Sequence, residues 1–102
     1  MYDNTKWKKE KIEDIIINNG FEISKQEPCY YELTLSAYGK KKSLMLRLNK
    51  SSINVNKFGS YWNGITSYKK LNHVLEHYNE VLKMDIFNNM SKRDRHLFNS
   101  TL

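Results

Sequence analysis

The feature of the sequence that most constrains the fold is a pair of alternating segments joined by a glycine-containing turn. The segment "CYYELTLSAY", residues 29–38, places on one face Cys29, Tyr31, Leu33, Leu35 and Ala37. In "SLMLRLNK", residues 43–50, leucines alternate with polar residues and a methionine. Because side chains alternate between the two faces of a strand, each segment predicts a strand with one buried face. The intervening "GKKK" predicts the turn of a β-hairpin.

A helix is predicted on each side of this hairpin. Residues 5–19 follow a candidate cap at Asn4 or Thr5 and precede Gly20, which is suited to the left-handed conformation after a helix. One face of this segment carries Trp7, Ile12, Ile15 and Ile16. Residues 66–84, capped by Thr66 or Ser67, carry at helical spacing Tyr68, Leu71, Val74, Leu75, Tyr78, Val81 and Leu82. Both apolar faces are suited to packing on the sheet.

Two further segments are candidate strands, "FEISKQ" at residues 21–26 and "SSINVNKF" at residues 51–58. The expected fold class is therefore α+β, with a small antiparallel sheet of two to three strands and two main helices packed on one face. The expected order is helix, strand, strand, strand, helix. We expect a single α+β domain over residues 1–90, followed over residues 91–102 by a basic C-terminal tail or short helix.

Positive charge is concentrated in the central third of the chain. Residues 39–70 contain seven lysines, one arginine and no acidic residue, whereas residues 1–38 carry a net charge of −2 and residues 71–102 balance. The +8 of the central third therefore accounts for the whole net charge of +6. Such asymmetry favours a basic surface that meets phosphates or an acidic protein surface.

The candidate nucleic-acid or partner surface combines these cations with neighbouring aromatic rings. Tyr30, Tyr38 and Arg47 are expected on the exposed face of the sheet, where rings stack on bases and arginine binds phosphate. Lys69 and Lys70 open the second predicted helix, whose N-terminus attracts anions. The full set is Tyr30, Tyr38, Lys40, Lys41, Lys42, Arg47, Lys50, Lys57, Tyr61, Trp62, Lys69 and Lys70. The alternative for the hairpin lysines is a solvated tip that prevents edge-to-edge aggregation.

Residues 57–68, "KFGSYWNGITSY", have the glycine, asparagine and serine content of a loop but also carry large aromatic rings. One interpretation is an aromatic loop beside lysines that stacks on bases or fills a partner's pocket. The other is that Phe58 and Trp62 fold back over an open end of the core. The two are compatible if Trp62 points inward and Tyr61 outward.

The sequence offers little for catalysis or metal binding. The pattern "HVLEH" places His73 and His77 on one side of a helix with Glu76 between them, but no third ligand is evident, so we expect no metal site. Cys29 is expected as a small core residue, and a lone cysteine is typical of a reducing cytoplasm. No acid, base and nucleophile converge, so we expect no enzyme and no cofactor. The longest apolar run is Ile15–Ile17, which is too short for a membrane span, so we expect no membrane partner.

Two resemblances add expectations. The stretch from "CYYELTLSAYG" to "TSYKKLNHVLEHY" is similar to a double-stranded-RNA-binding domain in its order of elements and in the lysines that open the last helix. The small size and the Lys, Asn, Ile and Tyr usage, typical of AT-rich coding, resemble small phage and mobile-element accessory proteins, including anti-CRISPR proteins. That resemblance implies a protein that occupies a surface of a host nucleic-acid-handling machine.

We therefore expect a non-enzymatic, cytoplasmic binding module of phage or mobile-element type, contacting nucleic acid or a nucleoprotein complex through the basic hairpin and aromatic loop. If about four phosphates are neutralised, the affinity should fall roughly a hundredfold between 50 and 200 mM salt. The alternative is an inhibitor of a host defence nuclease that acts by direct protein contact, with the aromatic loop as its anchor.

Overall fold

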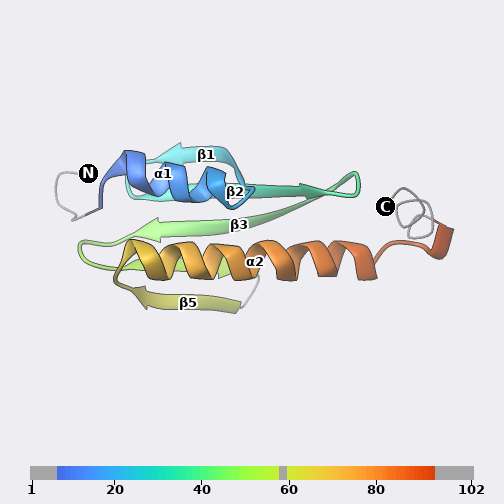
Figure 1. Cartoon of the computed structure of the whole chain (residues 1–102). Coiled ribbons are helices and arrows are strands. Elements are labelled where there is room, and N and C mark those ends of the chain that lie inside the picture. The colour runs from blue at the N-terminus through green and yellow to red at the C-terminus, as the bar shows by residue number, and fades with distance from the viewer. Residues whose placement is uncertain (1–6, 58–59, 94–102) are drawn as a thin grey trace.

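The computed structural model describes residues 7–57 and 60–93 of the chain, and Figure 1 shows their arrangement. The elements in chain order are α1 (Lys9–Asn18), β1 (Glu22–Glu27), β2 (Tyr30–Ala37), β3 (Lys40–Leu48), β4 (Ile53–Lys57), β5 (Ser60–Ile65) and α2 (Tyr68–Asn88). The strands form one antiparallel sheet in the order β1-β2-β3-β4-β5. Both helices lie on one face, α1 toward the β1 side and α2 toward the β5 side (Figure 1).

The α+β class and the helix pair on one face are confirmed, but the expected two to three strands are wrong because the sheet has five. The central hairpin β2–β3 pairs from Tyr30 opposite Arg47 to Ala37 opposite Lys40. The candidate segments supply β1 and β4, and β5 forms from the segment predicted to be a loop. This order of elements also departs from the helix, three-strand, helix order of a double-stranded-RNA-binding domain.

A bulge explains how the glycine-containing segment becomes β5. Ile65 pairs with Ile53 and Trp62 with Val55, so β5 has one more residue between these pairs than β4. Gly64 adopts a positive φ of 71° there, and its N–H donates to the Asn54 side-chain oxygen at 3.4 Å. Glycine accepts this conformation without the steric cost that a Cβ imposes, so its presence marks a bulge and not the end of the strand.

The hydrophobic core lies between the helices and the face of the sheet that they cover. Its strand residues alternate as the sequence predicts; they are Tyr31, Leu33, Leu35, Leu44, Leu46, Leu48, Ile53, Val55 and Ile65. The helices contribute Ile12, Ile16, Leu71, Val74, Leu75, Tyr78 and Leu82. The hydroxyl of Tyr31 donates to Glu13 at 3.1 Å, so the one polar atom of this buried ring has a partner on α1.

The first helix is shorter than the predicted residues 5–19. Its N-cap is Lys8, which makes no side-chain capping bond; the predicted caps Asn4 and Thr5 lie outside the described residues. The backbone N–H of Lys8 donates to the Tyr68 hydroxyl at 2.7 Å. Trp7 precedes the helix yet is buried, with its ring edge-on to Tyr68 at 5.2 Å. The predicted apolar face is therefore formed, partly from a residue outside the helix.

The end of α1 is the glycine-terminated motif that the sequence predicts. Gly20 has a φ of 83°, and its N–H donates to the Ile17 carbonyl while Phe21 N–H donates to the Ile16 carbonyl. These two bonds satisfy carbonyls that a helix end leaves without partners. The Asn79 side chain of α2 donates to the Asn19 carbonyl at 2.7 Å, which ties this helix end to α2.

The second helix begins at the predicted cap. The Ser67 side chain accepts a hydrogen bond from Lys70 N–H at 3.1 Å, and the buried stripe continues from Leu71 to Ile86. The helix extends to Asn88, beyond the predicted end at residue 84. Within the described ranges, neither helix has the length and apolar content needed to cross a membrane.

Two residues expected on strands lie instead in hairpin turns. Cys29 follows Pro28 in the β1–β2 turn with a φ of 66°, and it packs half-buried against the core. Tyr38 and Gly39 form the two-residue β2–β3 turn with φ values of 53° and 76°, as in a type I′ turn. The Tyr38 ring lies 5.4 Å from that of Phe87 on α2, so the expected position of Tyr38 on the exposed face is wrong.

Gly20→Ala is expected to lower the free energy of unfolding by about 2 kcal/mol, against about 1 kcal/mol for the control Gly39→Ala. In both variants the alanine is strained by the positive φ. Only at Gly20 does the added Cβ also come too close to another atom, Asn79 Nδ2 at 2.8 Å, whereas no atom lies within 4 Å of a Cβ at Gly39. That contact displaces the hydrogen bond to Asn19. Urea denaturation of both variants measures the difference, and equal losses would contradict this account of the α1–α2 junction.

Candidate nucleic-acid interface

The face of the sheet opposite the helices is uncovered by any described element (Figure 1). The residues that alternate with the core residues lie on it. On the three central strands they are Tyr30, Glu32, Thr34, Ser36, Lys41, Ser43, Met45, Arg47, Asn54 and Asn56. This open face is therefore polar, with a tyrosine, a methionine and an arginine near its centre.

Tyr30 and Arg47 form a cross-strand pair on the open face. They are directly opposite in the β2–β3 register, and the guanidinium carbon lies 5.8 Å from the centre of the tyrosine ring. Arg47 is exposed and Tyr30 half-buried. At this distance the cation is attracted to the ring, and the ring and the guanidinium are both planar groups that stack on nucleobases. The structure thus brings together two of the residues that the sequence selected.

A shallow recess adjoins this pair. It has a volume of about 170 Å³ and is lined by Tyr30, Met45, Arg47, Asn54, Asn56 and Asn63. The side-chain oxygen of Asn54 accepts the bond from Gly64 N–H described above. The side-chain oxygen of Asn56 is buried and, among the described residues, has no hydrogen-bond partner. The recess therefore joins flat stacking groups on β2 and β3 to amide groups on β4 and β5.

Charge divides the open face into two halves. Around β1 and β2 lie Glu22, Glu27 and Glu32, and Lys25 pairs with Glu27 at 3.3 Å. The hydrogen bond from Lys25 to Glu27 raises the pKa of this lysine. The open-face residues of β3 and β4, together with Asn63 of β5, include no acid, and Arg47 lies among them. A polyanion therefore meets less repulsion over the β3–β5 half.

The hairpin lysines are not free cations as a group. Lys42 lies 3.3 Å and Lys57 3.7 Å from the same carboxylate oxygen of Asp85, which α2 supplies from outside the basic third of the chain. Lys40 and Lys41 are exposed near the tip. The interpretation of eight unopposed cations is therefore wrong for Lys42 and Lys57. Their neighbours in the sequence include no acid, but Asp85, which is distant in the sequence, pairs with both.

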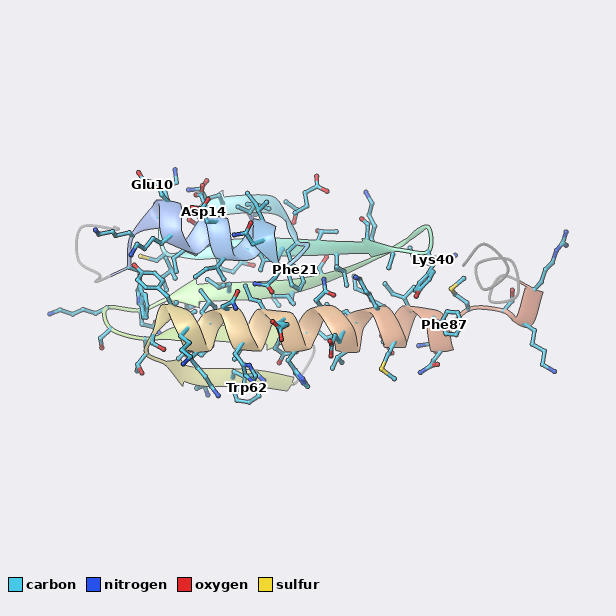
Figure 2. The ribbon with its side chains drawn as sticks, in the orientation of Figure 1. Glu10, Asp14, Phe21, Lys40, Trp62 and Phe87 are labelled. Atoms are coloured by element: carbon cyan, nitrogen blue, oxygen red, sulfur yellow. The ribbon has the colours of Figure 1, made fainter. Side chains whose placement is uncertain are left out.

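Lys69, Lys70 and Trp62 form a second, separate group on the helix side of β5. Trp62 pairs with the buried Val55, so its ring lies on the helix face and not on the open face. It is 38% exposed, and the Lys70 ammonium lies 4.9 Å from the centre of its ring. Trp62 is thus neither a core residue nor part of a loop. Figure 2 shows it beside the first half of α2, away from Lys40 and Phe87 at the hairpin end.

The predicted cations do not converge on one patch. Lys40 begins β3, whereas Lys50 lies in the β3–β4 turn at the opposite end of that strand. At about 3.3 Å per residue, they are roughly 25–30 Å apart. That separation exceeds the screening length of about 8–10 Å in physiological salt, so the two ends act independently on an anion.

Some candidates lie outside what the structure describes. Tyr61 belongs to the β5 backbone, but its side chain and the whole of Phe58 fall outside the described residues. The backbone of the predicted aromatic loop is nevertheless the edge strand β5, which overturns its assignment as a loop. The segment 91–102 is described only as far as residue 93.

The remaining chemical candidates stay apart. His73 and His77 are exposed on α2, and the described residues contain no group of three side chains suited to a metal ion. The residues that sequence analysis missed are Met45, Asn54, Asn56 and Asn63. Asparagine is common in this chain, so only the cross-strand register distinguishes these three. Alternation with Ile53 and Val55 is the sequence signal that places Asn54 and Asn56 on the exposed face, whereas Asn63 reaches that face only through the bulge at Gly64.

The contact with Lys42 predicts a titration behaviour for Asp85. The hydrogen bond from Lys42, with a further contribution from the charge of Lys57, holds the pKa of this carboxyl below its ordinary value. The ion contacts therefore stabilise the fold above the ordinary carboxyl pKa and are lost as the pH falls through the lowered one. In an NMR pH titration, Lys42→Met should raise the pKa of Asp85, while the control Lys40→Met should not. An ordinary pKa for Asp85 in the unmodified chain would contradict the contact.

No protein-family model matches this chain, and no curated protein or solved structure is significantly similar to it. Function therefore has to be inferred from the geometry of the described residues.

Proposed function

We propose that this protein is a non-enzymatic module that binds single-stranded nucleic acid on the open face of its sheet, from Tyr30 on β2 across β3 to β5. The observation that carries the proposal is the Tyr30–Arg47 pair beside the asparagine-lined recess. Aromatic rings and guanidinium planes on an exposed sheet are a recurring way to hold unstacked bases. The net charge of +6 attracts the phosphate backbone from a distance.

The recess favours a single strand over a duplex. Stacking on Tyr30 and Arg47 needs a base whose flat face is free, which a base inside a duplex does not offer. A duplex is instead read by an element that enters a groove or by contacts along both backbones. The open face is a broad surface of antiparallel strands with one arginine near its centre, and it presents no such inserted element among the described residues.

The open face is preferred to the hairpin end as the binding surface. Lys42 and Lys57 share Asp85, and the tip is joined to α2 through Tyr38 and Phe87. These contacts give Lys42 and Lys57 a role in holding the fold. Arg47, in contrast, contacts the Tyr30 ring on a surface whose neighbouring β3 to β5 side chains include no acid.

Arg47→Met is expected to weaken binding of a fluorescently labelled single-stranded 12-mer about tenfold, because it removes one stacking plane and one phosphate contact. Lys69→Met removes the same charge from the helix side and is the matched control, with an expected loss of about twofold or less. Fluorescence anisotropy at 50 mM salt, with DNA and RNA oligonucleotides, measures both. Equal losses, or a larger loss for Lys69→Met, would contradict the open-face site.

The salt dependence provides a second readout in the same titrations. If Arg47 and one hairpin lysine each neutralise a phosphate, a single strand should bind roughly sevenfold more weakly at 200 mM than at 50 mM salt. The hundredfold loss expected for a convergent basic patch would indicate that more cations take part. Absence of any anisotropy change at micromolar protein would reject nucleic-acid binding.

A second candidate function is inhibition of a host defence nuclease by direct protein contact, as in anti-CRISPR proteins. The observation that favours it is the edge strand β5, whose residues Ser60–Ile65 carry no charged side chain and include the exposed Trp62. The other edge strand, β1, carries Glu22, Lys25 and Glu27, which discourage pairing with a further strand. A partner's extended segment can add to the less protected edge, with Trp62 as anchor.

Under this second function, Trp62→Ala should abolish capture of a protein partner from nuclease-treated lysate of the native host. Arg47→Met should leave that capture intact, because Arg47 lies on the other face. Mass spectrometry of the captured proteins is the measurement. If capture from untreated lysate survives Trp62→Ala but is lost after nuclease treatment, the result would support nucleic-acid binding instead.

A further inference from the structure

We infer that the recess lined by Tyr30, Met45, Arg47 and the three asparagines is a site for one unpaired nucleobase, held through an N–H donor on its edge by Asn56. This deepens the proposed function and rests on it. The inference concerns which part of a bound strand enters the recess and why a paired base is rejected.

The volume of the recess limits the size of the ligand that it can hold. Pockets for whole cofactors or drug-sized ligands have volumes of about 300–1,000 Å³. At about 170 Å³, this recess is smaller, so it suits a single base and not a complete nucleotide with its sugar and phosphate. The sugar and phosphate of such a base would remain at the open side, within reach of the exposed Arg47.

The lining matches the two different surfaces of a nucleobase. The Tyr30 ring, the Arg47 guanidinium and the thioether of Met45 interact with the faces of aromatic rings. The amide groups of Asn54, Asn56 and Asn63 form hydrogen bonds with ring edges. Because the first group comes from β2 and β3 and the second from β4 and β5, one base can contact both at once.

Asn56 is the asparagine of the recess whose side-chain oxygen lacks a hydrogen bond. The oxygen of Asn54 already accepts the Gly64 N–H, whereas the buried oxygen of Asn56 has no partner within the described part of the chain. An acceptor buried without a hydrogen bond destabilises a structure. Solvent does not reach this oxygen in the present structure, but Asn56 itself lines the recess, so rotation of its side chain can bring the oxygen to a donor that a ligand supplies. The N–H groups on the Watson–Crick edge of an unpaired base supply such a donor. In a duplex those groups are already bonded to the opposite strand.

The test compares two oligonucleotides that differ in one group. An oligomer of adenosine carries an exocyclic amino group on each base, whereas an oligomer of purine riboside stacks similarly but lacks that donor. We expect the adenosine oligomer to bind about tenfold more tightly, since a site built for a hydrogen bond discriminates against a ligand that lacks it. Fluorescence anisotropy with both oligomers measures the ratio.

Variants assign the discrimination to one atom. Asn56→Leu removes the acceptor and should bring the ratio close to one. Asn56→Asp keeps an acceptor and should preserve the ratio, although its charge weakens both oligomers. Asn88→Leu, an exposed change on α2, is the matched control and should leave the ratio unchanged. Circular dichroism of each variant shows whether it is folded. A folded Asn56→Leu protein that retains the full ratio would overturn the role of Asn56.

The outcomes separate this inference from the proposed function. A ratio near one in the unmodified protein, with both oligomers bound, overturns the nucleobase site but leaves single-strand binding on the open face. If neither oligomer binds, both the nucleobase site and the proposed single-strand binding are contradicted. Free nucleotide is another source of the same chemistry, so adenosine monophosphate is titrated alone by calorimetry. Millimolar or weaker binding supports a base within a strand, and micromolar binding would overturn that assignment in favour of a free nucleotide.

Discussion

The structure depends on the burial of one face of the sheet, and only one, by the two helices. Both helices carry a single apolar stripe, so each packs on the sheet with one side and keeps the other in water. Because they lie on the same face, β2, β3 and β4 bury alternate residues on that face and leave the others half-buried or exposed. The open face exists because no second helical layer among the described elements covers it.

The same constraint explains what the sequence predicted well. The alternation around Leu33 and Leu46 and the helical stripe after Ser67 follow from the burial of one face, so they are visible in single segments. The hairpin, the capped start of α2 and the glycine at the end of α1 therefore agree with the structure. The pairing of Tyr30 with Arg47 was predictable for a similar reason, since both lie on exposed positions of one hairpin.

What could not be predicted depends on contacts between distant segments. β5 is recognisable only when its residues pair with β4, because the bulge at Gly64 interrupts the alternation that would identify a strand. Asp85 neutralises Lys42 and Lys57 from the far end of α2, and no local pattern in residues 39–70 indicates that. Asn54 and Asn56 become neighbours of Arg47 only through the β3–β4 register. Charge counted along the chain therefore overestimated the charge that one surface presents.

The β2–β3 turn at the hairpin tip shows why positive charge alone does not locate the site. Tyr38 occupies a left-handed conformation that normally favours glycine or asparagine, and its ring contacts Phe87. With the ion contacts to Asp85, this joins the tip of the long hairpin to the end of α2 and gives its aromatic and basic residues a structural role. Arg47 makes no ion pair with any described acid, and its guanidinium lies over the half-buried ring of Tyr30 on the neighbouring strand. A cation on a polar surface without such an acid remains available to a phosphate, and for this reason we propose the open face, and not the hairpin end with its larger number of cations, as the surface for a single strand.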